Sequence, residues 1–188
     1  MKIILFLLII FAFVGCKNNT NNDSPKSDSI NFDYIDFSFF ATNYGVFDIY
    51  SVKINNYGKI YIYKTELGLP ELEIKAKYFY IATLEKEQLD SVSKMAKTFL
   101  KDKLDSTYVE ENCCDNMSDF CLIVKSKQKK QKVKYYGDPY FHFEKPISLL
   151  NLSKYIDKLS KNIGKTTDST FIFESYTPYT RPKPNDMN

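Results

Sequence analysis

The fold is decided by residues 47–64, which read FDIYSVKINNYGKIYIYK. Apolar and polar residues alternate on both sides of the turn at 55–58, and this period of two predicts strands over 47–54 and 59–64. Gly58 can supply the positive φ angle that a short connection between two strands needs. The stretch therefore predicts an antiparallel β-hairpin.

Strand-like segments flank this hairpin on both sides. Residues 32–40 precede it and residues 73–82 follow it, after an interruption at Leu69-Pro70. Four consecutive strands without an intervening helix favour an antiparallel meander over a parallel sheet.

Two amphipathic helices are predicted after the meander. The first begins near Leu84, with Glu85 as the N-cap, Gln88 at the capping-box position and a hydrophobic staple between Leu84 and Leu89. Pro146 stands in the first turn of the second helix, and Gly164 stands where a left-handed C-terminal cap would end it. Both helices carry one apolar stripe, formed by Leu89, Val92, Met95, Ala96, Phe99 and Leu100 in the first and by Leu149, Leu152, Ile156, Leu159 and Ile163 in the second.

A second hairpin is predicted between the helices, with strands at 120–126 and 132–136 and a turn at 128–131. This register places Lys125 opposite Lys134 and Lys127 opposite Lys132. The four lysines then share one face, and the other face holds Leu122, Val124, Val133 and Tyr135. The lysine face either meets an acidic partner or is a solvated surface that prevents edge-to-edge aggregation.

These elements predict an α+β fold for a single domain at residues 31–165. We expect an antiparallel sheet of five to seven strands, in the order β-β-β-β-α-β-β-α, with two helices packed on one face. In the C-terminal segment, residues 166–188, Thr170–Phe173 can add a last edge strand before a proline-rich disordered tail.

The N-terminus has the pattern of a secretory signal peptide. Lys2 precedes an apolar run at 3–14, which is shorter than the roughly 20 residues that a membrane-spanning helix needs. Phe13-Val14-Gly15-Cys16 resembles the lipobox of bacterial lipoproteins. This resemblance implies that residues 1–15 are cleaved and that Cys16 carries the lipid, palmitate included, so the membrane is a partner through this anchor. The alternative is an ordinary secretory signal peptide in which Cys16 stands by chance. Residues 16–30 then form a flexible tether.

The folded part resembles an uncharacterised domain family found in bacterial lipoproteins. The resemblance covers roughly residues 31–163 and rests on 50–54, 58–61, 84–89, the second hairpin and Pro146. Members carry a Cys-x-Gly-x-Cys-Pro segment before the first hairpin, whereas residues 43–47 of this chain, NYGVF, keep only the glycine. The family implies no known reaction.

Three cysteines, Cys113, Cys114 and Cys121, remain after Cys16. In an oxidising compartment, a disulfide between Cys121 and either Cys113 or Cys114 is one outcome, and unpaired structural thiols are another. A third is metal or redox chemistry, in which Asp115, Asp119 or the single histidine, His142, would complete a metal-ligand shell. The sequence indicates no cofactor apart from the lipid on Cys16.

Four tyrosines form a candidate binding surface. Tyr61 and Tyr63 share one face of their strand, and Tyr78 and Tyr80 share one face of theirs, so the four rings form a ladder if the strands are neighbours. Such a ladder can bind peptides or sugars, or it can be core packing.

Charge excludes one class of function. The chain of 188 residues has 26 basic and 23 acidic residues, a net charge of +3, and Arg181 is its only arginine, so nucleic acid is not an expected partner. We expect a lipid-anchored protein on the periplasmic or outer face of the bacterial cell envelope, with a non-catalytic binding or structural role and an envelope protein as a candidate partner. The alternatives are a thiol-redox or other enzyme that uses the cysteine loop, and an inhibitor or immunity-type partner of a secreted enzyme.

Overall fold

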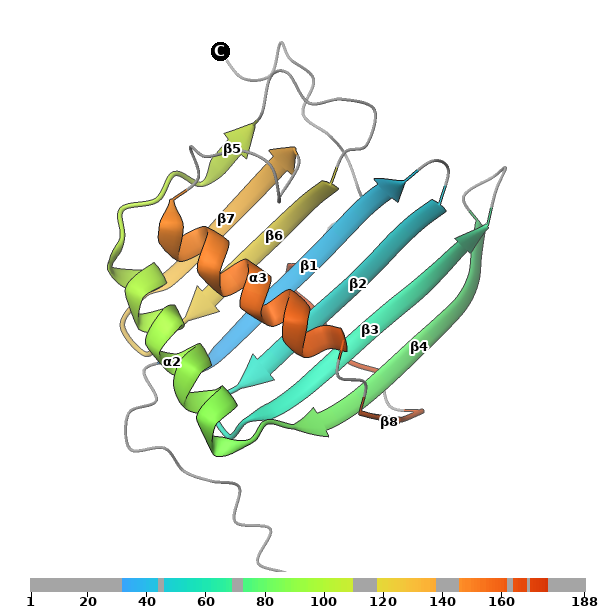
Figure 1. Cartoon of the computed structure of the whole chain (residues 1–188), viewed down its shortest axis with the longest axis horizontal. Helices are drawn as coiled ribbons and strands as arrows, with labels where there is room; N and C mark the ends of the chain where they lie inside the picture. Colours follow the sequence, from blue (N-terminus) through green and yellow to red (C-terminus); the bar gives the residue numbers. More distant parts are fainter. Residues whose placement is uncertain are drawn as a thin grey trace, which may run out of the picture.

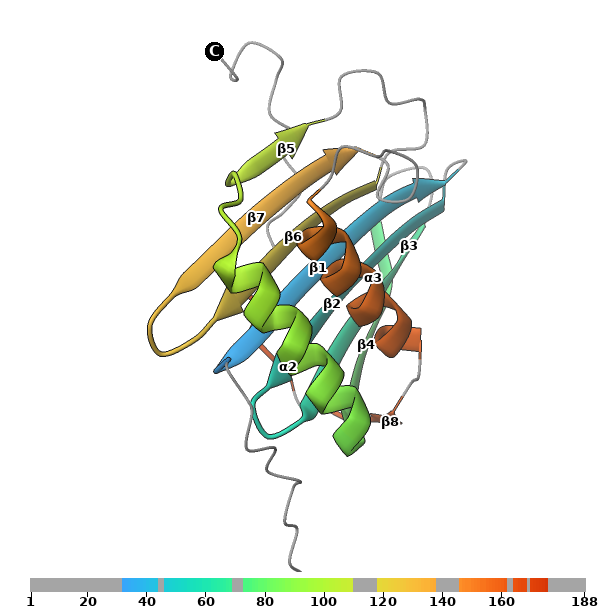
Figure 2. The same cartoon turned by 60° about the vertical axis from the view of Figure 1, so that its left-hand side comes forward.

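The computed structural model describes residues 32–43, 46–68, 73–109, 118–137, 146–161, 164–168 and 170–175. Within them the fold is α+β, as predicted, with two helices on one face of a sheet (Figures 1 and 2). The elements are β1 Tyr34–Asn43, β2 Val46–Asn55, β3 Lys59–Gly68, β4 Glu73–Thr83, α2 Lys86–Lys101, β5 Thr107–Val109, β6 Ser118–Lys125, β7 Lys130–Gly137, α3 Ile147–Lys161 and β8 Lys165–Thr166. Neither of these two helices is long and apolar enough to cross a membrane.

Within the described part of the chain, the sheet has eight strands in the order β5-β7-β6-β1-β2-β3-β4-β8. The meander of β1 to β4 is confirmed, and β1 also pairs with β6, which joins the meander to the second hairpin. The prediction of five to seven strands, all antiparallel, is wrong because β5 pairs with β7 in parallel and β8 extends the opposite edge. These two edge strands have only three and two residues, too few to show an alternating pattern in the sequence.

The first hairpin has the predicted turn. Gly58 has a φ of 75°, and the Asn55 side-chain oxygen accepts the N–H groups of Tyr57 and Lys59 at 3.0 and 2.9 Å. The Leu84 N–H donates to the Gly58 carbonyl at 2.8 Å, so the turn lies directly against the residue that precedes α2. Helix α2 then begins with the predicted capping box between Glu85 and Gln88.

Helix α3 begins after Pro146, whose carbonyl accepts the Leu150 N–H at 3.1 Å. The predicted role of Gly164 as a left-handed cap is wrong, because its φ does not lie in the left-handed region. A Cβ atom at Gly164 would lie 2.2 Å from the Ile81 carbonyl oxygen of β4. Glycine is therefore required here by the close approach of two backbones.

The second hairpin forms with a different register from the predicted one. Lys125 lies opposite Lys130, Ile123 opposite Lys132 and Cys121 opposite Lys134. The turn is closed at Ser126, whose N–H donates to the Lys129 carbonyl at 2.8 Å and whose hydroxyl accepts the Lys129 N–H at 3.1 Å. The shift preserves which side chains share a face, so the predicted apolar face is confirmed as buried: Leu122, Val124, Val133 and Tyr135.

The core fills the space between the sheet and the two helices. Helix α2 buries Leu89, Val92, Ala96 and Phe99 as predicted, and α3 buries its predicted stripe from Leu149 to Leu159, while Ile163 lies outside the described residues. The sheet contributes its inward-facing residues, among them Ile35, Phe37, Val52, Ile54, Ile60 and Ile62. We call the face of the sheet opposite α2 and α3 the outer face.

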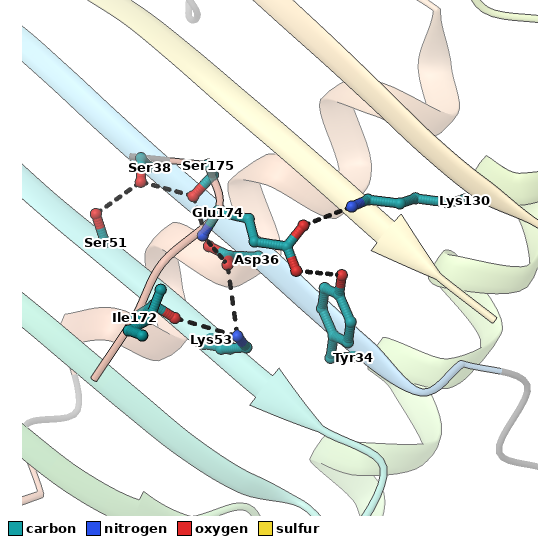
Figure 3. Close-up of polar contacts among 9 residues, drawn as sticks. All are labelled: Tyr34, Asp36, Ser38, Ser51, Lys53, Lys130, Ile172, Glu174 and Ser175. Atoms are coloured by element: carbon teal, nitrogen blue, oxygen red, sulfur yellow. Dashed lines mark hydrogen bonds and ion pairs between the residues drawn. The ribbon is translucent and has the colours of Figure 1, made fainter. Parts of the chain in front are cut away.

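Residues 170–175 are not an edge strand, unlike the predicted strand at 170–173. They leave the sheet edge after β8 and cross the outer face (Figure 3). We call residues 170–175 the crossing segment.

Candidate functional site

The outer face of β1 and β2 carries a row of polar side chains. Strand alternation places Tyr34, Asp36 and Ser38 of β1 on this face, next to Ser51 and Lys53 of β2. The helices α2 and α3 pack on the opposite face of the sheet, and the crossing segment lies over these residues (Figure 3). The site is therefore built from the central strands of the sheet and a segment that lies 119 to 140 residues away along the chain.

Asp36 is the centre of this site. Its side chain is 0% exposed and lies on β1, between β6 and β2. One carboxylate oxygen accepts the Glu174 N–H at 2.7 Å, and the other accepts the Ser175 hydroxyl at 2.5 Å, while the Lys53 ammonium lies 3.9 Å away. Burial raises the pKa of Asp36, and these hydrogen bonds and the Lys53 charge oppose that shift.

A row of three hydroxyl groups continues the contact with the crossing segment. Ser38 shares hydrogen bonds of 2.6 Å with both Ser51 and Ser175. Ser175 is 1% exposed, so its hydroxyl is held between the Asp36 carboxylate and the Ser38 hydroxyl in a site without access to bulk water. We call Asp36, Ser38, Ser51, Lys53 and Ser175 the Asp36 network.

The Glu174 side chain joins strands on either side of β6. It accepts a hydrogen bond of 2.6 Å from the Tyr34 hydroxyl of β1 and pairs with the Lys130 ammonium of β7 (Figure 3). The hydrogen bonds from Lys130 and Tyr34 lower the pKa of Glu174, and the same bond raises the pKa of Lys130. Burial, followed by the hydrogen bond to Glu174, raises the pKa of Tyr34.

The other half of the crossing segment packs on aromatic rings. The Phe171 ring centre lies 4.6 Å from that of Tyr61 and 6.0 Å from that of Phe79, and the Phe173 ring centre lies 6.2 Å from that of Tyr63. The residue between the two phenylalanines, Ile172, points its side chain away and is 84% exposed, but its carbonyl accepts a hydrogen bond of 3.1 Å from Lys53.

The predicted ladder of four tyrosines is wrong. Strands β3 and β4 are neighbours, but their register places Tyr61 opposite Ile81 and Tyr63 opposite Phe79. Tyr61 and Tyr63 therefore lie on the outer face, and Tyr78 and Tyr80 lie on the helix side, where Tyr80 packs against the core. Only the first pair contributes to the site.

The predicted lysine face is present with one exchange of residues. Lys125, Lys132 and Lys134 lie on the outer face of β6 and β7, but Lys127 lies in the turn, and Lys130 occupies the position opposite Lys125. We call Lys125, Lys130, Lys132 and Lys134 the lysine surface. It adjoins the Asp36 site through Lys130, which binds Glu174.

Cys121 is buried on the outer side of β6, with a free thiol, beside Ser38 of β1. Burial raises its pKa to about 11, and the charges of Lys132 and Lys134 offset only part of that shift. Reactive cysteines have a lowered pKa, so the environment of Cys121 disfavours the thiolate. The predicted disulfide remains a prediction, because Cys113 and Cys114 lie outside the described residues.

Several other predicted residues also lie outside the described part of the chain, namely Cys16 with the signal peptide and tether, Asp115, His142 and the tail from residue 176. Among the described residues, no group of three or more histidine, cysteine, aspartate or glutamate side chains is arranged to hold a metal ion.

Sequence reasoning did not find the Asp36 network. Asp36 lies at an outward position of a predicted strand, where a carboxylate is ordinary, and its partners Glu174 and Ser175 are about 140 residues away. No local pattern signals such a contact. In this network, the buried Asp36 carboxylate binds a main-chain N–H, that of Glu174, and a hydroxyl, that of Ser175.

Comparison with known proteins adds no family to this description. No protein-family model matches the chain, and no curated protein matches it either.

Proposed function

We propose that this chain is a lipid-anchored, non-catalytic binding module of the bacterial cell envelope, and that it binds its partner through the outer face of the sheet. The observation that carries the proposal is Asp36, a fully buried carboxylate on that face whose two oxygens bind a main-chain N–H and a hydroxyl. A buried charge in a sheet costs free energy that an apolar side chain does not, so it suits selective binding better than stability.

The sequence of residues 13–16 supports a lipid anchor on Cys16, and the position of the folded domain relative to Cys16 is compatible with such an anchor. Strand β1 begins at Tyr34, shortly after the predicted tether at 16–30, so the domain would be linked to the membrane by a polar stretch that leaves its surface accessible. The lipid on Cys16 would supply the membrane affinity, since acyl chains contribute about 0.8 kcal/mol per buried methylene.

The environment of Cys121 favours a binding role over the thiol-redox alternative. A redox cysteine is activated by a lowered pKa and partial exposure, whereas burial raises the pKa of Cys121. The Asp36 carboxylate is engaged with three groups of the protein and is not placed as a free general base.

The lysine surface supports an inhibitor or immunity-type role less strongly. Strand β7 pairs with β5 only at 134–136, which leaves residues 130–133 as a sheet edge. Lysines at such an edge prevent pairing with a strand of another molecule. This role accounts for Lys130 and Lys132 without a partner protein. An acidic partner on this surface would bind more weakly in high salt than in low salt, because exposed charges are screened.

Membrane fractionation of the full chain, expressed in a bacterial host, tests the anchor. Cys16→Ser is expected to move the protein from the membrane fraction to the soluble fraction, because Cys16 is the proposed attachment point of the lipid. Cys121→Ser is the matched control and should leave the protein in the membrane fraction. Membrane retention of Cys16→Ser would overturn the proposed anchoring.

Site-specific cross-linking in intact envelopes tests the binding face. A photoreactive side chain at Lys132, which is exposed on the outer face of β7 and lies outside the crossing segment, is expected to give a discrete cross-linked product that Lys53→Met abolishes. The control position is Glu87, exposed on α2 at the opposite side of the sheet. Equal products from both positions, or a product that Lys53→Met does not change, would contradict binding at the outer face.

A further inference from the structure

The crossing segment makes a specific contact with the sheet at each residue from Phe171 to Ser175. Phe171 and Phe173 pack on aromatic rings of β3 and β4, and the Ile172 side chain points to solvent while its carbonyl is bound by Lys53. The Glu174 N–H is bound by Asp36 and its carboxylate by Tyr34 and Lys130, and the Ser175 hydroxyl lies inside the Asp36 network. The contacts of the outer face thus correspond to the sequence pattern of residues 171–175: an aromatic residue, any residue, an aromatic residue, an acidic residue and a serine.

We propose that the outer face is a binding site for an extended peptide segment of another protein with this pattern, and that the crossing segment occupies the site as an intramolecular competitor. The inference rests on the proposed binding function and names its ligand. Recognition through main-chain groups together with alternating side chains is a common way to bind extended peptides.

The site can be emptied without leaving buried groups unsatisfied. Asp36, Ser38 and Ser51 are covered on the outer face by the crossing segment and not by a helix, so water reaches them when the segment leaves. Part of the contact is already solvated, because the side chains of Lys130 and Glu174 are 47% and 38% exposed. A polar contact of this kind costs less to open than a packed apolar core.

The short connection to the sheet favours a partner protein over a second copy of this chain. The Thr167 N–H donates to the Phe79 carbonyl at 2.9 Å, which holds the chain at the edge of β4. Only three residues lead from Thr167 to Thr170, and they span about 10 Å when fully extended. A second copy could not deliver its own crossing segment to this site without releasing β8. A separate protein has no such restriction.

Charge further defines the ligand. Lys130 pairs with the Glu174 carboxylate, and Lys53 and Lys125 lie 4.9 and 5.6 Å from the ring centre of Tyr34, whose hydroxyl donates to the same carboxylate. Three ammonium groups therefore surround the end of the site that holds the acidic residue. An acidic residue that follows the two aromatic residues would therefore contribute more than a neutral one.

A synthetic peptide of residues 170–175 with an N-terminal fluorophore is the probe, and fluorescence anisotropy is the measurement. The receptors are the wild-type full chain and full-length Phe171→Ala/Phe173→Ala, in which the competitor is weakened. The peptide is expected to bind the variant at least about tenfold tighter than the wild type, since a tethered competitor must first be displaced.

Matched variants identify the site. Asp36→Asn in the weakened receptor is expected to reduce affinity at least about tenfold, because it removes the charge that accepts two hydrogen bonds. In the peptide, replacing Glu174 by Gln should weaken binding, and replacing Ile172 by Ala should leave it unchanged, because that side chain is exposed. Absence of binding to the weakened receptor, or equal binding by its Asp36→Asn form, overturns the proposal.

A second receptor guards against loss of folding in the double variant. The full chain with a protease site inserted at position 169 is folded first and then cut, and circular dichroism follows it while the released fragment is removed. A native spectrum with recovery of peptide binding supports the proposal, and unfolding overturns it by showing that the crossing segment belongs to the core.

A heterodimer between full-length Asp36→Asn and full-length Phe171→Ala/Phe173→Ala would assign the site to a second copy and overturn the choice of partner. Outer-face cross-linking and Cys16→Ser fractionation do not depend on any of these results, so the proposed function and its ligand fail separately.

Discussion

Replacing Ser175 by Ala tests how strongly the Asp36 network holds the crossing segment. The Ser175 hydroxyl donates to the Asp36 carboxylate at 2.5 Å and shares a bond of 2.6 Å with Ser38, and the side chain is buried. A hydrogen bond to a charged group contributes about 1.5–3 kcal/mol and a neutral one about 0.5–1.5 kcal/mol. Asp36 keeps the Glu174 N–H, and Ser38 keeps Ser51, so we expect a loss of about 2 kcal/mol in the free energy of unfolding.

The assay is urea denaturation of the full chain at neutral pH, followed by circular dichroism. Ile172→Ala is the control in the same segment, and its free energy of unfolding should stay within about 0.5 kcal/mol of the wild type because the side chain is exposed. Combining Ser175→Ala with Asp36→Asn gives a double-mutant cycle, for which we expect a coupling energy of about 1–2 kcal/mol between the two residues.

Two results would refute this reasoning. A loss below about 0.5 kcal/mol for Ser175→Ala would mean that its buried hydroxyl is not bound to a carboxylate in solution. Additive effects of Ser175→Ala and Asp36→Asn would mean that the two side chains do not interact, whatever the size of each single effect.

Three further predictions concern pH, packing and the thiol. Because burial raises the pKa of Asp36 from 3.8, the contribution of Asp36 to the free energy of unfolding should fall as pH rises from about 4 through its folded pKa. The pKa of Glu174 is lowered from 4.5, so the stabilisation by Glu174 is instead lost as pH falls. The difference in the free energy of unfolding between wild type and Asp36→Asn should isolate Asp36, and a difference that does not change with pH would contradict this prediction. Gly164→Ala should lower the free energy of unfolding by about 2 kcal/mol or more in the same urea assay, because the new Cβ atom would lie 2.2 Å from the Ile81 carbonyl oxygen. A variant as stable as the wild type would show that the backbone at residue 164 does not approach β4 so closely. Alkylation of Cys121 at about pH 8, mapped by peptide mass spectrometry, should be slow in the native chain and fast in urea, because burial raises its pKa to about 11, and rapid native modification would restore the redox alternative.

Local patterns predicted most of the elements correctly because their causes are local. The alternation at 47–64 and Gly58 specify a hairpin whose turn and strands need only neighbouring residues. The capping box at Glu85 and Gln88 likewise joins residues three apart. The predicted register of the second hairpin is wrong, because a shift by an even number of residues leaves the apolar alternation unchanged. The Ser126 hydroxyl, which accepts the Lys129 N–H, selects one of these registers.

The candidate site depended on contacts that no local pattern encodes. The alternation predicted that Tyr61 and Tyr63 share a face and that Tyr78 and Tyr80 share a face, but only the register between β3 and β4 decides that these are opposite faces. The aromatic residues at 171 and 173 carry the same alternating signal as a strand, and an edge strand was therefore expected there.

Periodicity and short-range hydrogen bonds specify the α+β class, the meander, the two helices with their buried stripes and the apolar face of the second hairpin, so these features are predictable from the amino-acid sequence. The pairing of β6 with β1, the parallel pairing of β5 with β7 and the path of the crossing segment over the outer face depend on tertiary contacts. The Asp36 carboxylate and the Ser175 hydroxyl gain their hydrogen bond only after about 140 residues have folded between them, so this contact depends on the whole sheet.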